Sequence, residues 1–460
     1  ASDYPADRFE IVMVDNGSLD DVVERVRHEL PSVRIIESLE NTGFAGGCNL
    51  GIRAEGSFDH VALVNNDATV DPGWLRPLVT ALEHGDVPVD ARRDPGRGGR
   101  AGRLGAVCPK ILFEGRHQEL TVTVPDAARI GRDPRPLGVR ISGVRLDGER
   151  ADHRLQFDEG FHPPEGPHAP DDEEIAVWST GSGRIRLRAD DEPVARLDVR
   201  VSSLEPRHLV LASGPNELPP RSVLEHTWVG IDLDPTRHDI VNNVGSNLYE
   251  NGFGGDRGFL ELDHGQYDEP AEVFAWCGGA VLLHGRYLAE VGLFDERLFL
   301  YYEDTDLSWR GRLAGWTYLT VPSSVVRHRH AQSSGVHSPV FRHHTERNRI
   351  LVLAKNAPAP LAARAVLGVL RRVIVFGVRD LLVRPLTLRM PVRAEVAHQW
   401  RVMRGVMERL PAMLRDRRAA SRARVDRRAA MAWQTRKHTA AAPTIGHPAA
   451  PPTPVEAVTA

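Results

Sequence analysis

Cysteine is scarce in this chain, which holds three in 460 residues. Cys48, Cys108 and Cys277 are odd in number and far apart, and no Cys-x-x-Cys pair exists. This spacing indicates neither a disulfide framework nor a zinc site, so we expect a reducing, cytosolic compartment. Long hydrophobic runs are missing as well. No uninterrupted apolar stretch approaches the ~20 residues that span a bilayer, and no signal peptide opens the chain.

Charge is unevenly distributed along the sequence. The net charge is -4, yet residues 361–437 hold 19 Arg and Lys against 5 Asp and Glu, so the remainder is clearly acidic. The length favours two or three domains, and the composition is that of a globular protein with a large core. Residues 1–7 contain no methionine and no strand pattern. We therefore expect the chain to be part of a longer one.

The first hundred residues alternate short apolar runs with helical periodicity. Strands are expected at residues 11–14, 34–37, 61–64 and 104–107, and helices at residues 19–29, 48–54 and 73–83. This alternation predicts an α/β fold in which a parallel sheet carries helices on both faces. Residues 84–103, rich in Gly, Arg, Asp and Pro, are expected to form a loop.

The pattern changes near residue 115. Short alternating segments recur at residues 121–124, 184–188, 196–201 and 208–211, between Pro, Gly and Asp clusters. They predict an inserted all-β module, a small sandwich, with an acidic loop at 158–174. The expected domains are 1–114, the inserted module at 115–240, 241–356, a basic helical extension at 357–437 and a disordered tail at 438–460.

Two polar motifs follow early strands. Asp15 ends a strand and precedes Asn16, Gly17 and Ser18, so its carboxylate can accept hydrogen bonds from a base or ribose. A turn with a helix N-cap at Ser18 explains the same four residues and is the commoner arrangement. Residues 41–49 hold closely spaced glycines before a helix, which lets the backbone approach a phosphate. A tight turn packed against the sheet is an equal alternative.

Acidic residues end one strand and open one helix. Asp67 follows an apolar strand with Asn65 and Asn66 beside it, and a hard cation on a diphosphate needs only one or two protein carboxylates. An Asx turn is the alternative. Residues 299–310 place three acids within four positions beside aromatic residues. One of these carboxylates can serve as a general base, or all three can serve the helix dipole.

Histidine and arginine complete the set of candidates. His328 and His330 lie two apart on an extended segment, so they point to the same side and either can complete a metal site. Mixed histidine and carboxylate ligands favour manganese over magnesium. Arg347 offers a guanidinium fork suited to phosphate. A surface histidine pair and a solvated helix face are the respective alternatives.

The order of these motifs resembles family 2 glycosyltransferases, most closely their bacterial rhamnosyltransferase and galactofuranosyltransferase branch. The resemblance covers roughly residues 8–112 and 240–356, about half the chain. Its motifs are Asp15-Asn-Gly-Ser, Asn41 to Asn49, Asn65-Asn-Asp67, Trp276-Cys-Gly-Gly279, Gly292-Leu-Phe-Asp295, Tyr302-Glu-Asp-Thr-Asp-Leu307 and His328. It implies a GT-A (Rossmann-like) nucleotide-sugar-binding fold and an inverting single displacement.

The resemblance also implies where the donor binds. The expected contacts to the nucleotide sugar are Asp15, Asn16, Gly17, Ser18, Asn41, Gly43, Gly46, Gly47, Asn49, Asn66 and Arg347. The family's opening strand carries a motif like Val-Val-Ile-Pro-Thr-Tyr-Asn that helps to bind the base. This sequence has no counterpart of it, which puts donor binding by the chain as given in question.

The same resemblance implies the reacting groups. Asp67 matches the last acid of the metal-binding DxD motif and, with His328, is expected to hold Mn²⁺ or Mg²⁺. Asn65 stands where that motif often has Asp, so the site carries less negative charge. Asp304, next to Glu303, matches the catalytic base. The expected acceptor side consists of Trp276, Cys277, Gly278 and Gly279.

The resemblance therefore implies transfer of a sugar, with rhamnose as the more specific expectation, to a glycan or polyprenyl-linked acceptor in cell-envelope polysaccharide synthesis. The basic residues of 361–437 predict peripheral contact with anionic lipid at the inner face of the membrane. Nucleic acid is the alternative partner for the basic residues of 361–437, but we do not expect it to bind. A nucleotidyltransferase would need a basic glycine-rich loop, which residues 41–49 lack. A catalytically impaired carbohydrate-binding protein, using module aromatics such as Trp178, is the other alternative.

Overall fold

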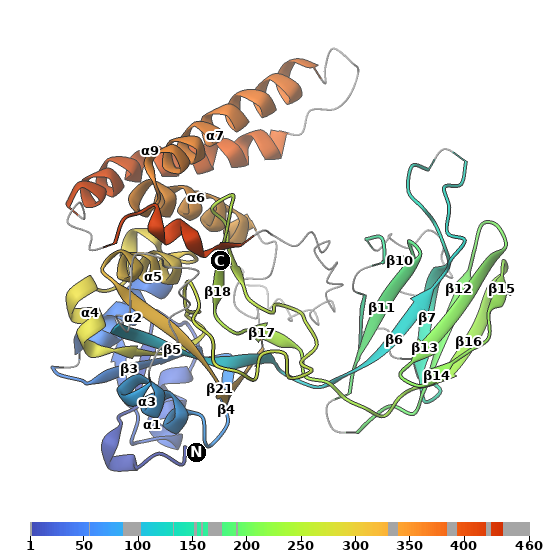
Figure 1. Ribbon diagram of the computed structural model, residues 1–460, viewed down its shortest axis with the longest axis horizontal. Helices are drawn as coiled ribbons and strands as arrows, with labels where there is room; N and C mark the ends of the chain where they lie inside the picture. Colours follow the sequence, from blue (N-terminus) through green and yellow to red (C-terminus); the bar gives the residue numbers. More distant parts are fainter. Residues whose placement is uncertain are drawn as a thin grey trace, which may run out of the picture. The chain divides into compact units, whose positions relative to one another are not determined.

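In the computed structural model, the chain forms two compact units (Figure 1). The first comprises residues 1–114 and 241–437, and the second begins with residues 115–240. The described residues are 2–54, 56–85, 103–131, 133–150, 154–157, 160–163, 177–189, 192–329, 339–383, 393–419 and 425–435. His330, the expected tail at 438–460 and most of the expected loops at 84–103 and 158–174 lie outside these ranges.

Two sheets form the first unit. β1 (Val12–Asp15) and β2 (Arg34–Glu37) pair in parallel. The larger sheet has the order β3-β20-β5-β21-β4, with β17 paired to β5. Its strands are β3 (His60–Val64), β20 (Ala280–His284), β5 (Arg103–Phe113), β21 (Trp316–His328), β4 (Ala68–Val70) and β17 (Val241–Asn243).

The expectation of an all-parallel sheet is wrong. β5 and β21 are parallel, but β20 runs antiparallel to both of its neighbours, and β4 is antiparallel to β21. The alternation of strands and helices does not fix strand direction when a long insertion separates two strands. Here residues 115–240 lie between β5 and β20 in the sequence. With so long a connection, β20 can run either parallel or antiparallel to β5.

Helices cover both faces of the larger sheet, as expected. Along β20, Val281 and Leu283 join the core formed with α2 (Gly43–Ala54), α4 (Gly285–Val291) and α5 (Glu303–Leu313). Leu282 joins the opposite core formed with α3 (Leu75–His84). α1 spans Val22–Glu29. α2 begins five residues before the expected residue 48, because the Asn41 side chain caps the Gly43 amide at 2.9 Å; the glycines at 43, 46 and 47 therefore lie within a helix.

The later part of the chain is helical, as the basic extension predicts. α6 (Pro339–Asn356), α7 (Ala359–Val378) and α9 (Arg393–Ala419) share one core with α5, which includes Trp309, Leu351, Val369 and Val406. β18 (Ser246–Tyr249) pairs with β19 (Gly254–Asp256) and with β22 (Gln434–Thr435). Among the described helices, none combines the length and apolar content needed to cross a membrane.

The second unit consists of two antiparallel sheets that share one apolar core. One sheet contains β10 (Val177–Trp178), β7 (Arg140–Leu146), β12 (Arg196–Ser202), β16 (Thr227–Asp232) and β8 (Glu149–Arg150). The other contains β14 (Asn216–Glu217), β13 (Arg207–Ser213), β6 (His117–Thr123), β11 (Ser182–Arg188), β9 (Leu155–Phe157) and β15 (Arg221–Val223). Trp178 is buried, so the idea that its ring stacks on a sugar is wrong.

Candidate active site

Asp67 and His328 meet where two neighbouring strands lie side by side. Asp67 directly precedes β4, His328 ends β21, and the ladder pairs His328 with Ala68. The distance from Asp67 Oδ1 to His328 Nε2 is 2.9 Å. On the other side of the ring, Nδ1 lies 3.2 Å from Oδ1 of the buried Asn242 in β17. An amide oxygen only accepts, so Nδ1 carries a proton and Nε2 faces Asp67.

This pair fits a divalent cation that also binds a diphosphate. Adjacent ligands of an octahedral ion at about 2.1 Å lie roughly 3 Å apart, close to the separation seen here. Within the described ranges, no three His, Cys, Asp or Glu side chains form a complete metal shell. Asp67 and His328 are therefore the two side chains here that could hold such a cation, and Asn242 contacts the imidazole from its other side.

Two consecutive glycines connect this pair with the start of α5. The Gly278 amide donates to Asp304 Oδ2 at 3.2 Å. The Gly279 carbonyl accepts from the Asn65 amide at 3.0 Å, and a Cβ on Gly279 would lie 4.0 Å from the His328 ring. Residues far apart in the sequence are thereby brought to one short turn.

The three acids that open α5 have three different environments. Asp304 accepts hydrogen bonds from the amides of Gly278 and Thr305, yet burial raises the pKa of its carboxyl. Glu303 is buried, and its Oε2 has no hydrogen-bond partner among the described residues. Burial, then the charge of Asp304, raises its pKa well above the usual value, which favours its neutral form. Asp304 is therefore the better placed base of the two.

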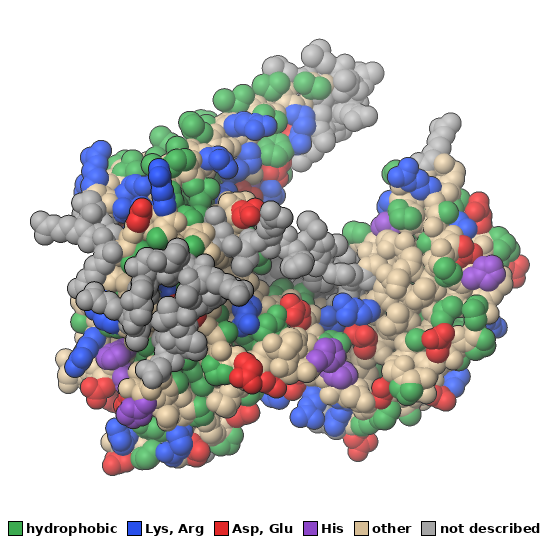
Figure 2. Space-filling model, viewed as in Figure 1, with side chains coloured by type: hydrophobic (Ala, Val, Ile, Leu, Met, Phe, Trp, Pro, Cys, Tyr) green, Lys and Arg blue, Asp and Glu red, His purple; other side chains and the backbone are tan. Residues whose placement is uncertain are grey.

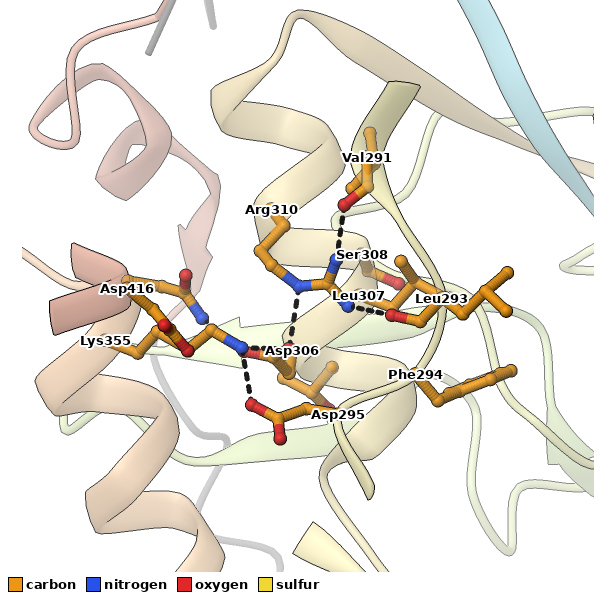
Figure 3. A network of polar contacts seen from close by, with 12 residues as sticks. Val291, Leu293, Phe294, Asp295, Asp306, Leu307, Ser308, Arg310, Lys355 and Asp416 are labelled. Carbon is orange, nitrogen blue, oxygen red and sulfur yellow. Dashed lines mark hydrogen bonds and ion pairs between the residues drawn. The ribbon is translucent and has the colours of Figure 1, made fainter. Parts of the chain in front are cut away.

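Asp306, the third acid, belongs to a buried ion network (Figure 3). Its carboxylate accepts from Lys355 Nζ at 2.9 Å, Asn356 Nδ2 at 2.8 Å and Arg310 Nε at 2.8 Å. Lys355 also contacts Asp295 at 2.7 Å. Although burial opposes ionisation, Lys355 and Arg310 hold the pKa of Asp306 below its usual value. This carboxylate fixes α5 against α6 and is fully buried, so a substrate does not reach it.

A cavity of about 560 Å³ opens beside the network, and its lining includes Arg53, Glu296 and Lys355. These charged groups already pair with one another or with neighbouring side chains. The lining does not include Asp67 or Asp304, so the cavity is separate from the chemistry proposed below.

The loop before α5 has a strained backbone. Phe299, Tyr301 and Tyr302 have φ values of 67°, 67° and 70°, a region that side chains other than glycine rarely adopt. Asn348, fully buried in α6, donates its amide to three carbonyl oxygens within residues 298–301, at 2.7 to 2.9 Å. These bonds compensate the strain and hold the first turn of α5, which contains Asp304.

The donor side is connected to the same loop. Asn16 donates to the Gly43 carbonyl at 2.9 Å and accepts from the Thr42 amide at 2.9 Å. Gly43 has φ +71°, and a Cβ there would lie 2.4 Å from the Phe299 carbonyl oxygen. Only glycine permits this approach, so the 41–49 segment packs directly on the strained loop.

Several predicted ligands turn inward. Asp15 is buried and accepts from the Ser18 amide at 3.0 Å. The alternative of a helix N-cap at Ser18 is wrong, because α1 begins at Val22 and Asp21 occupies its N-cap position. Asn49 is fully buried and donates to the Phe294 carbonyl at 2.9 Å. Trp276 is fully buried and packs edge-on against Phe294, so its ring does not face an acceptor.

Arg347 also turns inward, which argues against the phosphate role expected for it. The side chain is buried and donates to the Leu298 carbonyl at 2.9 Å. Burial lowers the pKa of Arg347 to about 10. The expected ligands that keep exposed or half-buried positions are Asn16, Gly17, Ser18, Asn41, Asn66 and Cys277, whereas Gly46 and Gly47 are buried in α2.

Three further residues of this region could not be recognised from the sequence, because no sufficiently specific pattern marks them. Asn242 orients His328, and Asn348 lies one position after the flagged Arg347. Asp256 in β19 accepts from Asn243 Nδ2 at 2.6 Å. Its carboxylate is exposed at the surface, yet the surrounding protein desolvates it and, with the charge of Asp304, raises its pKa to about 6. Asp256 and Asp304 therefore form an interacting pair of acids.

Residues 1–128 match the family model of Glycosyl transferase family 2. N-acetylglucosaminyl-diphospho-decaprenol L-rhamnosyltransferase, from two strains of Mycobacterium tuberculosis, is 46% identical over 69 residues. This match covers 15% of the chain, which spans about a fifth (22%) of the length of these relatives.

The chain also shows similarity to solved structures. The chain is similar to GalNAc-T7 with UDP, GalNAc and Mn²⁺, with a TM-score of 0.34 and 12% identity over 88% of this chain and 50% of that one. It is similar to a mannosyltransferase from Pyrobaculum calidifontis in complex with GDP-Man and Mn²⁺, with a TM-score of 0.31 and 12% identity over 89% and 80% of the two chains.

The expected fold class is confirmed: a GT-A-type α/β fold with an inserted all-β module and an Arg-rich helical extension. The family match is to a glycosyltransferase model over residues 1–128, and the activity of the chain is therefore a matter for proposal. The likeness to a rhamnosyltransferase is partial in length, and the donor and acceptor are therefore matters for proposal.

Proposed function

We propose that this protein is an inverting glycosyltransferase that acts at the cytoplasmic face of the membrane in cell-envelope polysaccharide synthesis. It moves a sugar from a nucleotide-sugar donor to a hydroxyl group of a glycan or polyprenyl-linked acceptor. One observation carries the proposal. The Gly278 amide donates to the carboxylate of Asp304, and the carbonyl of Gly279, the next residue, accepts from the Asn65 backbone amide; a Cβ on Gly279 would lie 4.0 Å from the His328 ring. A base and a cation-binding pair are thus joined by two residues.

The reaction proceeds in one displacement. Asp304 takes the proton of the acceptor hydroxyl, whose oxygen forms a bond to the anomeric carbon. The bond from that carbon to the diphosphate breaks, and its electron pair leaves with the diphosphate. Attack from the opposite face inverts the anomeric configuration. A Mn²⁺ or Mg²⁺ ion held by Asp67 and His328 would supply Lewis-acid stabilisation of the leaving diphosphate.

The environment of Asp304 suits a base. Burial raises the pKa of Asp304, so its carboxylate binds a proton more strongly than an ordinary aspartate does, as a general base that works near neutral pH requires. The amides of Gly278 and Thr305 fix the direction of the carboxylate. Asn16, the backbone around Gly43 and the exposed Asn66 form the donor side of this proposal, while Cys277 and the two glycines form its acceptor side.

Rhamnose is the proposed sugar. The 69-residue match to a rhamnosyltransferase supports it, and the same relative supports N-acetylglucosaminyl-diphospho-decaprenol as the proposed acceptor. A carbohydrate-binding role of the β module receives no support from its tryptophans. Trp178 is buried, and the guanidinium of Arg145 lies 4.2 Å from the ring centre of Trp228.

Two measurements test the proposal. Thermal shift across a panel of nucleotide sugars, with and without Mn²⁺, identifies the donor, and a transfer assay with that donor follows. Asp304→Asn should lower kcat by about 10²- to 10⁴-fold while the donor-induced thermal shift persists.

Asp21→Asn provides the matched control, because Asp21 is an exposed acid at the start of α1 without a capping hydrogen bond. It should leave transfer unchanged. Equal rates for Asp304→Asn and the original protein would remove Asp304 as the base. No thermal shift with any nucleotide sugar would contradict the glycosyltransferase proposal for this chain.

A further inference from the structure

Helix α7 has two unlike faces. Its twenty residues, Ala359–Val378, include three arginines and no acidic residue. Ala362, Ala365 and Val369 are buried, and the last two join the core shared with α5, α6 and α9. The side chains on this inner face are small or branched, as a close helix contact requires.

The outer face is apolar although it is exposed. Leu367, Leu370, Ile374 and Val378 follow one another at spacings of three, four and four residues, which places them in a single stripe. Their exposed fractions range from 36% to 64%. We call these four residues the α7 stripe. A helix face in contact with water alone would carry polar side chains at such positions.

Arginines border the α7 stripe on one side. Arg364 and Arg371 are exposed and, on a helical wheel, lie beside Leu367 and Val378. Among the described residues, no hydrogen bond or ion pair is found for either guanidinium. Figure 2 shows basic and hydrophobic side chains next to one another along α7 and α9. Positive charge next to exposed apolar surface is therefore available on this face.

We propose that the α7 stripe docks the protein on an anionic lipid surface. The four apolar side chains enter the boundary between headgroups and acyl chains, with α7 parallel to the membrane plane. Arg364 and Arg371 extend from the same face to lipid phosphates, their methylene stems lying along the apolar surface. This goes beyond the glycosyl-transfer proposal and does not depend on it.

The charges decide among the occupants that could cover this face. A second copy packed symmetrically through α7 would bring Arg364 and Arg371 against the same two residues of its partner, which is unfavourable without acids to pair them. Nucleic acid would attract the arginines but would leave the α7 stripe in water. An anionic bilayer surface satisfies both features at once.

Vesicle binding tests the proposal on the full chain. Co-sedimentation should show binding to vesicles of phosphatidylcholine with 30% phosphatidylglycerol, and much weaker binding to phosphatidylcholine alone. Leu367→Gln with Ile374→Gln should lower the partition coefficient at least tenfold, and Arg364→Gln with Arg371→Gln about 30-fold for the anionic vesicles.

Matched pairs in the second unit provide the controls. Leu204→Gln with Leu224→Gln changes two exposed leucines, and Arg129→Gln with Arg221→Gln changes two exposed arginines. Both control variants should bind vesicles as the original protein does. Circular dichroism of every variant verifies that the fold is retained, since all the substituted positions are exposed.

A local probe distinguishes insertion from general adhesion. Ile374→Cys labelled with an environment-sensitive fluorophore should brighten and shift to the blue on anionic vesicles, whereas Leu204→Cys should not. Selective labelling is feasible because burial raises the pKa of the thiols of Cys48 and Cys108 to about 12, and that of Cys277 well above its usual value.

Three results would overturn the proposal. One is unchanged vesicle binding in the variants of the α7 stripe. A second is a dimer in sedimentation velocity that these variants dissociate, with no vesicle binding by the original protein. The third is binding of short duplex DNA that the arginine variants abolish, while vesicles are not bound. Loss of sugar transfer with vesicle binding intact would instead contradict only the proposed reaction.

Discussion

His328 Nε2 lies 2.9 Å from Asp67 Oδ1, although 261 positions separate the two residues in the chain. The contact follows from the sheet, because β21 and β4 are antiparallel neighbours and Asp67 directly precedes β4. The imidazole is held from its other side by Asn242. These three residues make the structural core of the proposed cation site.

Metal dependence should follow this geometry. In Asp67→Asn the amide is a weaker ligand than the carboxylate, so the Mn²⁺ concentration for half-maximal transfer should rise about 100-fold. Asn242→Ala should raise it about tenfold, because the ring loses its orientation but both ligands stay. Manganese titration of the transfer rate and direct calorimetry of Mn²⁺ binding measure both effects. Unchanged Mn²⁺ affinity in Asp67→Asn would place the cation elsewhere.

Removal of the Asn348 amide should loosen the strained loop. In Asn348→Leu, three carbonyl oxygens within residues 298–301 lose their donor, and the positive φ values of Phe299 and Tyr301 become uncompensated. We expect a loss of about 2–4 kcal/mol in the free energy of unfolding. Transfer should fall in kcat more than in KM, because the base at 304 loses its fixed position.

Asn348→Asp is the useful companion variant to Asn348→Leu. It keeps the size but brings acceptors to a site that needs donors, so it should be at least as harmful. Urea unfolding of each variant, followed by kinetics under conditions where it is folded, separates the two effects. A variant with normal stability and normal kcat would show that the loop keeps its conformation without Asn348.

The pH dependence of transfer should reflect the raised pKa values of Asp256 and Asp304. The proposed base must be ionised, and burial raises the pKa of Asp304, so kcat/KM should rise with pH above the usual carboxyl range. Asp256→Asn removes a neighbouring negative charge and should move this acid limb to lower pH. An acid limb near pH 4 in the original protein would contradict the arrangement.

The same pair predicts a stability effect with a definite sign. The folded-state pKa of Asp256 is raised to about 6, so folding favours its protonated form and stability declines as pH rises from about 4 through 6. Asp256→Asn should therefore raise the melting temperature at pH 8 relative to the original protein, and change it little at pH 4. Differential scanning calorimetry at the two pH values measures the difference.

The ion network behind α5 should dominate stability. Lys355→Met leaves the carboxylates of Asp295 and Asp306 buried without their shared ammonium, and we expect a loss of about 3–5 kcal/mol. Adding Asp306→Asn should recover part of it, since one of the two buried carboxylates that lost the ammonium is then neutral. Urea unfolding gives both values. A loss below 1 kcal/mol would show that the network is dispensable.

Sequence patterns predicted the local elements well, because they depend on neighbours in the chain. β2 was placed at its observed bounds, 34–37, and the short alternating segments of residues 115–240 do form an all-β unit. The beginning of α2 was missed because its first turns are rich in glycine, a poor helix former. The cap from Asn41 and the contact with Phe299 override that preference.

The sequence by itself determined which residue types follow which elements, and so identified Asp67, Asp304 and His328 as candidates. It could not determine strand direction, or which side chains turn inward. Asn49, Trp276 and Arg347 are buried, and Asp306 is neutralised by a lysine 49 positions later. These outcomes depend on packing between distant segments and on desolvation, which raises the pKa of Asp304 and lowers that of Arg347. Tertiary structure alone decides both.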